Sequence, residues 1–251
     1  MDKKLKLAVI GKPISHSKSP EIHQDFANQF NTKIEFKKDE VTPETLETWL
    51  VDFFKDDGKG VSITLPLKEA ALNYADEISD RARLASACNV IYAKDEKIFA
   101  DCTDGFGLIK DLEANLKVSL KDKKILILGA GGAARGIIPS IIEKKPEKLK
   151  VANRTESKAL LLREDLEAKV DLKEKNTIFE AGDLSDDFLL ADSYDLVINS
   201  TSVSTQAGES LELPKALFSG TKLAYDLFYS VENTVFMQEA LAAGAEKVSD
   251  G

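Results

Sequence analysis

Short apolar runs alternate along the chain with segments in which apolar residues recur every three or four positions. Runs of the first kind are typical of buried β-strands, and the second pattern is typical of helices that pack one face on a sheet. In the first part of the chain the predicted strands cover residues 5–10, 34–36, 60–64, 90–93 and 98–100. The alternation of the two patterns predicts an α/β fold.

Two helices are predicted in this first part, and each follows a hydroxyl residue and a proline. Ser19 and Pro20 form a typical N-cap with proline in the first turn, after which apolar residues recur on one face. Those residues are Ile22, Phe26 and Phe30. Thr42 and Pro43 repeat the signal, and the buried stripe of that helix should comprise Leu46, Trp49, Leu50, Phe53 and Phe54.

A second series of elements begins at residue 125. An apolar run over 125–128 leads into a glycine-rich turn, and a helical pattern over 134–144 and a strand over 149–152 complete a βαβ unit. Further strands are predicted at 177–179, 196–199 and 223–227, while residues 105–115 should form a connecting helix. We therefore expect two domains, residues 1–104 and 105–251, of which the second is a Rossmann-like, doubly wound sheet.

Composition and charge narrow the class of protein. A chain of 251 residues with 43% hydrophobic and 31% charged residues is typical of a soluble globular protein with one large or two modest domains. The net charge of -9 argues against a general nucleic-acid binder, because binding to the phosphate backbone needs a concentrated basic surface. No apolar run is long enough to span a bilayer or to form the core of a signal peptide, so we expect a cytoplasmic protein.

The cysteines and histidines do not suggest a metal centre. Cys88 and Cys102 are the only cysteines, and in a chain without export signals such a pair should stay reduced. Neither they nor His16 and His23 have the spacing of metal ligands. We expect no metal site.

The turn after the strand at 125–128 has the pattern of a dinucleotide-binding site. Gly129 would permit the tight turn, Gly131 the close approach of a pyrophosphate, and Ala134 the packing of the helix on the strand. A flexible loop is the alternative, but strand, turn, helix and second strand follow one another in the required order. The candidate cofactor contacts in this turn are Gly129, Ala130, Gly131, Gly132 and Ala133.

The residues after the second strand of that unit favour NADP over NAD. An NAD enzyme usually carries an acidic residue there against the ribose 2′-hydroxyl, and no carboxylate occupies residues 151–155. Arg154 could instead bind a 2′-phosphate, assisted by Lys158 and by the polar groups of Asn153 and Thr155. The alternative is that Arg154 only solvates the start of the next helix.

Polar residues also follow the strands of the first part. Ser17 and Ser19 could hold a carboxylate together with N–H groups at a helix start, although capping alone explains Ser19 equally well. Lys68 and Asp104 form a candidate acid–base pair, because burial and a neighbouring charge tune a side chain for proton transfer. The sequence by itself does not establish that the two meet.

An ordered series of motifs resembles the shikimate dehydrogenase family over nearly the whole chain. The motifs are PISHSKSP, SITLPLK, ACNV, CTDG, GAGGAARG, NRT, NSTS and YDLFY, and their combination is much more specific than any one of them. The resemblance implies a substrate-binding first domain and an NADP-binding second domain. The activity that it implies is the reversible, NADP-dependent reduction of 3-dehydroshikimate to shikimate in aromatic amino-acid biosynthesis.

The resemblance also implies roles for single residues. Residues that bind the substrate carboxylate or its surroundings would be Ser17, Ser19, Thr64 and Tyr229. Contacts with the ring hydroxyls would come from Lys68, Asn89 and Asp104. Lys68 would help to protonate the ketone oxygen while NADPH delivers hydride, and Asp104 would orient the lysine.

Further cofactor contacts follow from the same resemblance. Leu227 and Gly251 would approach the nicotinamide, and Asp80 aligns with another cofactor contact. The chain departs from the family at Ser62 and Cys102, where asparagine is common, so we expect substrate contacts to be rearranged. Family members usually continue into a helix that returns to the first domain, and we expect that helix to be absent here.

Two other functions stay open at this point. One is a quinate/shikimate dehydrogenase with broader substrate or cofactor use, and the other is a catalytically weakened nucleotide-binding homologue. Retention of both Lys68 and Asp104 favours an enzyme. The expected partner is a small-molecule substrate, with no nucleic acid and no membrane, and the protein should be a monomer or a homodimer.

Overall fold

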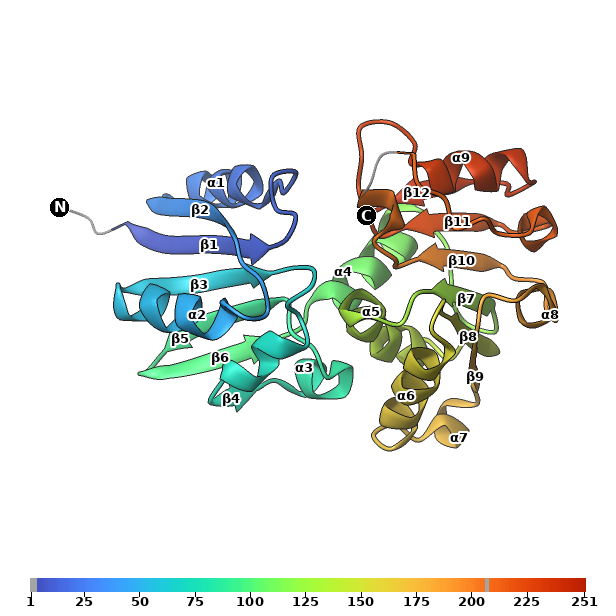
Figure 1. The fold of residues 1–251 in the computed structure, drawn as a ribbon, viewed down its shortest axis with the longest axis horizontal. Coiled ribbons are helices and arrows are strands. Elements are labelled where there is room, and N and C mark those ends of the chain that lie inside the picture. The colour runs from blue at the N-terminus through green and yellow to red at the C-terminus, as the bar shows by residue number, and fades with distance from the viewer. Residues whose placement is uncertain (1–3, 206–207) are drawn as a thin grey trace. The chain divides into compact units, whose positions relative to one another are not determined.

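The protein consists of two α/β units, each built on its own sheet (Figure 1). A computed structural model describes residues 4–205 and 208–251. It divides into the compact units Met1–Asp104 and Gly105–Gly251. The α/β fold that the alternating patterns predict is confirmed.

The first unit contains a mixed sheet with the strand order β2-β1-β3-β5-β6-β4. Its strands are β1 (Leu5–Gly11), β2 (Ile34–Glu40), β3 (Gly58–Ile63), β4 (Glu77–Ile78), β5 (Val90–Lys94) and β6 (Lys97–Asp101). β1 pairs in parallel with β2 and β3, whereas β5 runs antiparallel to both β3 and β6. Its helices are α1 (Ser19–Gln29), α2 (Leu46–Lys55), a 3-10 turn (Ala70–Tyr74) and α3 (Asp80–Ala85).

Helix α2 packs on this sheet through the stripe that the sequence predicts. Its buried residues are Leu46, Leu50 and Phe53, and Trp49 and Phe54 lie partly buried against them. The predicted start at Thr42 and Pro43 is wrong, since the helix begins at Leu46. The hydroxyl of Thr45 accepts the Thr42 N–H at 3.1 Å, which holds the preceding residues in a separate turn.

Helix α1 differs from the sequence prediction in its cap and in its apolar face. Lys18 is the N-cap, no side chain caps the helix, and the Ser17 hydroxyl accepts the Ser19 N–H at 3.3 Å. The apolar face that begins at Ile22 is solvent-exposed, with Phe26 at 50% and Phe30 at 77%. The helix contacts the sheet instead through Ala27, which is buried, and through the His23 ring beside β2.

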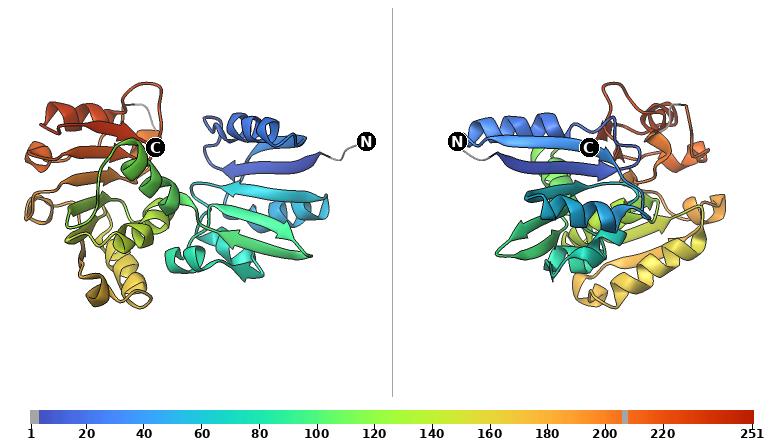
Figure 2. Two further views of the ribbon diagram at one scale, coloured as in Figure 1. Left: turned by 180° about the vertical axis from the view of Figure 1, so that it is seen from behind. Right: turned by 60° about the vertical axis from the view of Figure 1, so that its left-hand side comes forward.

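The second unit contains a wholly parallel sheet with the order β12-β11-β10-β7-β8-β9. Its strands are β7 (Lys124–Leu128), β8 (Lys148–Ala152), β9 (Ile178–Gly182), β10 (Leu196–Asn199), β11 (Leu223–Asp226) and β12 (Val248–Asp250). The winding direction reverses between β7 and β10, as Figures 1 and 2 show. Ligands of doubly wound sheets bind at such a switch point, outside the carboxyl ends of the strands.

Both faces of the second sheet are covered, because side chains of successive strand residues point in opposite directions. Ile125 and Ile127 of β7 belong to one core, and Leu126 and Leu128 to the other. Helices α4 (Asp104–Lys110), α5 (Gly132–Glu143) and α6 (Glu156–Glu167), with the π-helical turn Asp111–Asn115 and α7 (Leu172–Lys175), contribute to the first core. Helices α8 (Asp186–Leu189) and α9 (Val235–Ala242), with the 3-10 turn Lys215–Phe218, contribute to the second.

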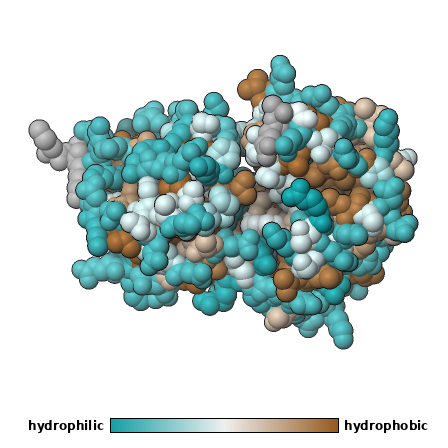
Figure 3. Space-filling view, in the orientation of Figure 1, coloured by the Kyte–Doolittle hydropathy of each residue, from teal (hydrophilic) through white to brown (hydrophobic). Residues whose placement is uncertain are grey.

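The face of the protein drawn in Figure 3 is largely polar. Hydrophilic side chains cover most of the face drawn in Figure 3, in keeping with the charged fraction of the sequence. Within residues 4–205 and 208–251 no helix is both long enough and apolar enough to cross a membrane.

Candidate active site

Four neighbouring strands of the first sheet place polar residues at one edge. β1, β3 and β6 end at this edge, and the antiparallel strand β5 begins there. Residues beyond those strand ends therefore lie at the same edge of the sheet although they are distant in sequence. They are Ser17 and Ser19 after β1, Thr64 and Lys68 after β3, Asn89 before β5 and Asp104 after β6.

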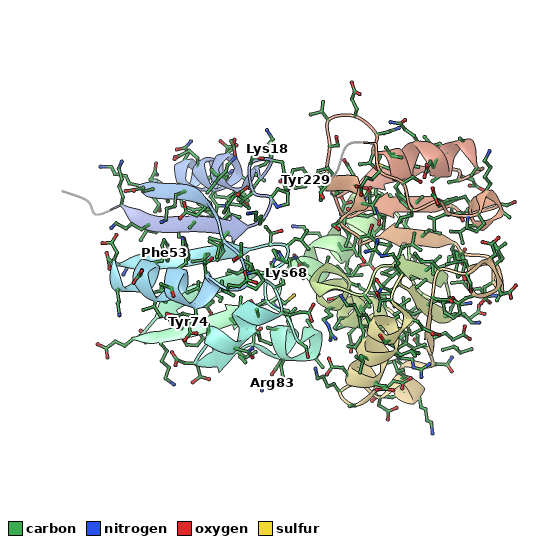
Figure 4. All side chains as sticks on the ribbon, in the orientation of Figure 1. Lys18, Phe53, Lys68, Tyr74, Arg83 and Tyr229 are labelled. Atoms are coloured by element: carbon green, nitrogen blue, oxygen red, sulfur yellow. The ribbon has the colours of Figure 1, made fainter. Side chains whose placement is uncertain are left out.

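Lys68 and Asp104 form an ion pair at this edge. Lys68 Nζ donates to Asp104 Oδ2 at 2.5 Å, and the two side chains retain 15% and 22% of their accessible surface. The labelled Lys68 lies beyond the end of β3 in Figure 4. The pair is thus largely desolvated but still reachable, as a general acid must be.

Asn89 holds the carboxylate of this pair in place. Its Nδ2 donates to Asp104 Oδ1 at 2.9 Å, and its Oδ1 accepts the Thr103 N–H at 2.9 Å. The Asn89 backbone N–H donates to the Asp101 carbonyl at the end of β6. Sequence reasoning missed Thr103, although its place beside Asp104 in CTDG was a signal.

Two buried thiols lie beside the Lys68 and Asp104 pair. Burial raises the pKa of Cys88 and of Cys102 to about 12, and the charges of Lys68 and Asp104 act on both thiols. The two thiols are not joined by a disulfide. Because a thiol with such a pKa is neutral at physiological pH, the two thiols add no charge beside the ion pair.

The loops after β1 and β3 are joined by backbone hydrogen bonds. The Lys12 N–H donates to the Leu65 carbonyl at 2.8 Å, next to Thr64. In the first loop the buried Ser17 donates its hydroxyl to the Ser19 hydroxyl at 3.2 Å. Three of the four predicted hydroxyls thus follow two neighbouring strands: Ser17 in the loop after β1, Ser19 at the start of α1, and Thr64 directly after β3.

The glycine turn after β7 has the geometry that a dinucleotide needs. Gly129 has a φ of +104°, and a Cβ there would stand 2.7 Å from Ser200 Oγ, so only glycine fits. Gly131 is the N-cap of α5, and a Cβ there would meet no atom within 4 Å. The open space beside Gly131 and the uncapped N–H groups of α5 suit a pyrophosphate.

The turn after β8 and the first turn of α6 expose two basic side chains. Arg154 and Lys158 are both exposed, and Asn153 Nδ2 donates to the Thr155 carbonyl at 2.8 Å, which turns the chain into α6. The turn lies on the other side of β7 from β10. A phosphate at this end of a dinucleotide would meet cations rather than a carboxylate.

The ends of β11 and β12 bring together two further candidates, Leu227 and Gly251. A Cβ on Gly251 would stand 3.2 Å from the Leu227 carbonyl, and the Leu227 N–H donates to the Asn199 carbonyl at 2.9 Å. Asn199 and Asp226 are completely buried, and sequence reasoning assigned a role to neither. The available signal was a polar residue at the end of an otherwise apolar strand.

The remaining candidates lie on exposed segments. Asp80 is the exposed first residue of α3 in the first unit. Tyr229 belongs to the second unit, is 37% exposed and stacks on Phe228 with 5.9 Å between ring centroids. Among the residues that the structure describes, no three His, Cys, Asp or Glu side chains are placed to hold a metal ion.

Comparison with known proteins gives one consistent family. Residues 9–91 match the family described as "Shikimate dehydrogenase substrate binding domain", and residues 111–220 match "Shikimate / quinate 5-dehydrogenase". The shikimate dehydrogenase (NADP(+)) of Hahella chejuensis is 39% identical over 97% of this chain and 86% of its own length. That of Colwellia psychrerythraea is 40% identical over 97% and 84%, respectively.

Solved structures agree with the sequence matches. Shikimate 5-dehydrogenase from Thermus thermophilus, solved in complex with NADP(H) and shikimate, is 31% identical with a TM-score of 0.81 over 98% of this chain and 86% of its own. Shikimate dehydrogenase from Aquifex aeolicus is 26% identical with a TM-score of 0.83 over 99% and 86%. On these matches and the two sheet edges described above, the chain belongs to the shikimate dehydrogenase family.

Proposed function

We propose that this protein catalyses the reversible, NADP-dependent reduction of 3-dehydroshikimate to shikimate in aromatic amino-acid biosynthesis. The observation that carries the proposal is the cluster of Lys68, Asp104 and Asn89 at one sheet edge, in a chain that also has a dinucleotide turn. Relatives of about 40% identity with the name shikimate dehydrogenase (NADP(+)) support it.

The hydroxyl groups would bind and orient the substrate carboxylate. Ser17, Ser19 and Thr64 follow the neighbouring strands β1 and β3 of the first unit, and Tyr229 would add a hydroxyl from the second. A hydroxyl can both donate and accept, so this set suits an anionic group flanked by polar atoms. Asn89 and Asp104 would contact the ring hydroxyls.

Lys68 would act as the general acid and, in the reverse direction, as the general base. Bound NADPH would supply the hydride to the ketone carbon. The Lys68 ammonium would donate a proton to the developing alkoxide oxygen, and in the reverse direction it would accept the proton. Asp104 keeps the ammonium in place through the 2.5 Å contact and is itself fixed by Asn89. Placement of this kind lowers the barrier because the donor is already oriented.

The cofactor would lie along the carboxyl edge of the second sheet. Residues that would contact its pyrophosphate are Gly129, Ala130, Gly131, Gly132 and Ala133. The ribose 2′-phosphate would meet Arg154 and Lys158, with Asn153 and Thr155 in the same turn. Leu227 and Gly251 would approach the nicotinamide, and Asp80 would give a further contact.

A quinate/shikimate dehydrogenase is the second candidate, because the family that matches residues 111–220 includes quinate dehydrogenases by its description. A catalytically weakened homologue is less well supported, since the ion pair of Lys68 and Asp104 is intact. We also propose a cytoplasmic location and a monomeric or homodimeric state, the latter to be measured by light scattering.

The deciding experiment is the oxidation of NADPH by the purified protein. Rates with 3-dehydroshikimate, with 3-dehydroquinate and without substrate are compared, and NADH replaces NADPH in a parallel series. We expect turnover with 3-dehydroshikimate and NADPH. Comparable turnover with 3-dehydroquinate would favour the second candidate, and no turnover with either substrate would contradict both.

A further inference from the structure

A completely buried carboxylate at the end of β11 has no part in the mechanism above. Asp226 Oδ1 accepts hydrogen bonds from Asn199 Nδ2 and from the Phe228 N–H, both at 3.1 Å. Its Oδ2 accepts from the hydroxyls of Ser204 at 2.6 Å and Thr234 at 2.7 Å. All four donors are neutral, and burial raises the pKa of Asp226 although the hydrogen bonds oppose that shift.

Three of the four donors belong to two loops at the carboxyl edge of the second sheet, and the fourth, Asn199, is the last residue of β10. Phe228 and Thr234 lie near the two ends of the loop after β11, so one carboxylate closes that loop. Ser204 lies in the loop after β10 and is also the acceptor of a hydrogen bond from Asn199 at 3.0 Å. Asp226 therefore ties the two loops to each other and to the end of β10.

The same network reaches the glycine turn. Asn199 Oδ1 accepts the hydroxyl of Thr201 at 2.7 Å, and Ser200 Oγ donates to the Leu128 carbonyl at 2.7 Å. Ser200 and Thr201 are also the residues whose side chains a Cβ on Gly129 would approach most closely. Asp226 is thus linked through Asn199 to the residues after β10 that pack against the glycine turn after β7.

A buried carboxylate without a cationic partner is costly, so its retention needs a reason. We propose that Asp226 is a positioning residue for the nicotinamide half of NADP(H). It fixes the loops after β10 and β11, which carry Leu227 and Tyr229, without itself touching cofactor or substrate. The proposal rests on the proposed function. The 2′-phosphate end, at the turn after β8 on the other side of β7, is outside its reach.

The test separates the two halves of the cofactor. Asp226→Asn puts an amide N–H₂ among four donors, and Ser204→Ala removes one donor and leaves three. Affinity is measured for NADPH and for 2′,5′-ADP, which has the 2′-phosphate but no nicotinamide, together with kcat and thermal stability. Ser210→Ala is the matched control, because the Ser210 hydroxyl bonds to Glu239 outside the network.

We expect Asp226→Asn to weaken NADPH binding and to lower kcat by on the order of 10-fold or more, since it leaves buried donors unpaired. Ser204→Ala should act in the same direction by a smaller factor. Binding of 2′,5′-ADP should stay within about twofold for both. If Asp226→Asn does not fold, Ser204→Ala gives the same comparison.

Three results would overturn the proposal. Equal losses for NADPH and 2′,5′-ADP would mean that Asp226 only supports the unit as a whole. Unchanged NADPH binding and kcat in both variants would mean that the loops need no such anchor. Failure of the unmodified protein to bind NADPH would overturn the cofactor assignment itself, and this proposal with it.

Discussion

The two sheets of this protein carry opposite kinds of polar edge. At the first edge the functional groups are ionised side chains that remain partly accessible, Lys68 and Asp104. At the second edge they are backbone N–H groups around Gly131, and the carboxylate of Asp226 at the end of β11 is completely buried. The first arrangement suits proton transfer, and the second suits the binding and orientation of a ligand.

The difference follows from topology. In the first sheet the antiparallel strand β5 starts where β1, β3 and β6 end, so a side chain that precedes a strand, Asn89, meets side chains that follow strands. In the second sheet all strands are parallel, and the switch point exposes a helix N-terminus. Substitutions at the first edge should therefore change mainly the rate. Those at the second edge should change cofactor affinity, and also the rate where they displace the nicotinamide.

Lys68→Ala tests the first half of this comparison and should have the largest effect. Loss of a general acid typically costs on the order of 100- to 10,000-fold in turnover, so kcat should fall by that factor while the KM for 3-dehydroshikimate changes much less. Steady-state NADPH oxidation measures both. Lys97→Ala, which removes an exposed lysine paired with Glu77, is the control. A kcat near that of the unmodified protein would remove Lys68 from the mechanism.

Arg154→Ala tests the second edge. It removes a cation that a 2′-phosphate could use and a 2′-hydroxyl could not, so NADPH affinity should fall by roughly 10- to 100-fold and NADH affinity by much less. Both dissociation constants are measured by fluorescence titration. Lys222→Ala is the control, because Lys222 precedes β11 at the opposite edge of the sheet. Equal losses for the two cofactors would contradict the assignment.

Two glycines of one turn should separate binding from folding. Gly131→Ala adds a methyl group in open space, so thermal stability should be unchanged while NADPH affinity falls by on the order of 10-fold. Gly129→Ala has to keep a φ of +104° beside Ser200, so it should cost about 1–3 kcal/mol of stability. Melting curves measure the stability of both variants, and NADPH titrations measure their affinity for the cofactor. Loss of stability in Gly131→Ala would contradict the proposal that Gly131 serves to let the pyrophosphate approach the backbone.

Asp192 offers the counterpart of Asp226, because it is a mostly buried carboxylate with cationic partners. Burial raises its pKa, but hydrogen bonds from Lys148 and Lys150 outweigh this and hold the pKa below 3.8. A depressed pKa stabilises the folded state above the unfolded value, and that contribution is lost as the pH falls through the folded pKa. Asp192→Asn should cost about 1–2 kcal/mol at pH 7 with activity unchanged.

Urea unfolding of Asp192→Asn and of the unmodified protein at pH 7 and near pH 3 checks this expectation. The difference in unfolding free energy should shrink at the lower pH. Asp187→Asn, at an exposed position on α8, is the control. A difference that is equally large at both pH values would show that packing rather than charge accounts for the loss.

The sequence predicted the second sheet better than the first unit's helices. Strands buried on both faces are continuous apolar runs, and the strand at 196–199 has the predicted bounds. The short strands β4 and β12 were missed, because two or three residues show no periodicity. The apolar face of α1 is the opposite case, since a stripe with Phe26 and Phe30 normally indicates packing and here is exposed.

At the candidate site the sequence predicted the residue types but not all of their partners. Local motifs placed Lys68 and Asp104 after strands, whereas their contact depends on the strand order, which no local pattern contains. Asn89 was expected to contact substrate, and the structure adds that it holds Asp104. Asp226 was missed because its four partners come from segments that only the fold brings together.

The contact between the glycine turn and Ser200 has a consequence for the order of folding. Ser200 and Leu128 are 72 residues apart, so closure of a long loop must come before the turn acquires its native shape. During synthesis the glycine motif leaves the ribosome well before the residue that shapes it. We therefore expect NADP(H) to bind this unit only after β10 has docked on β7, which would make its binding a late event in folding.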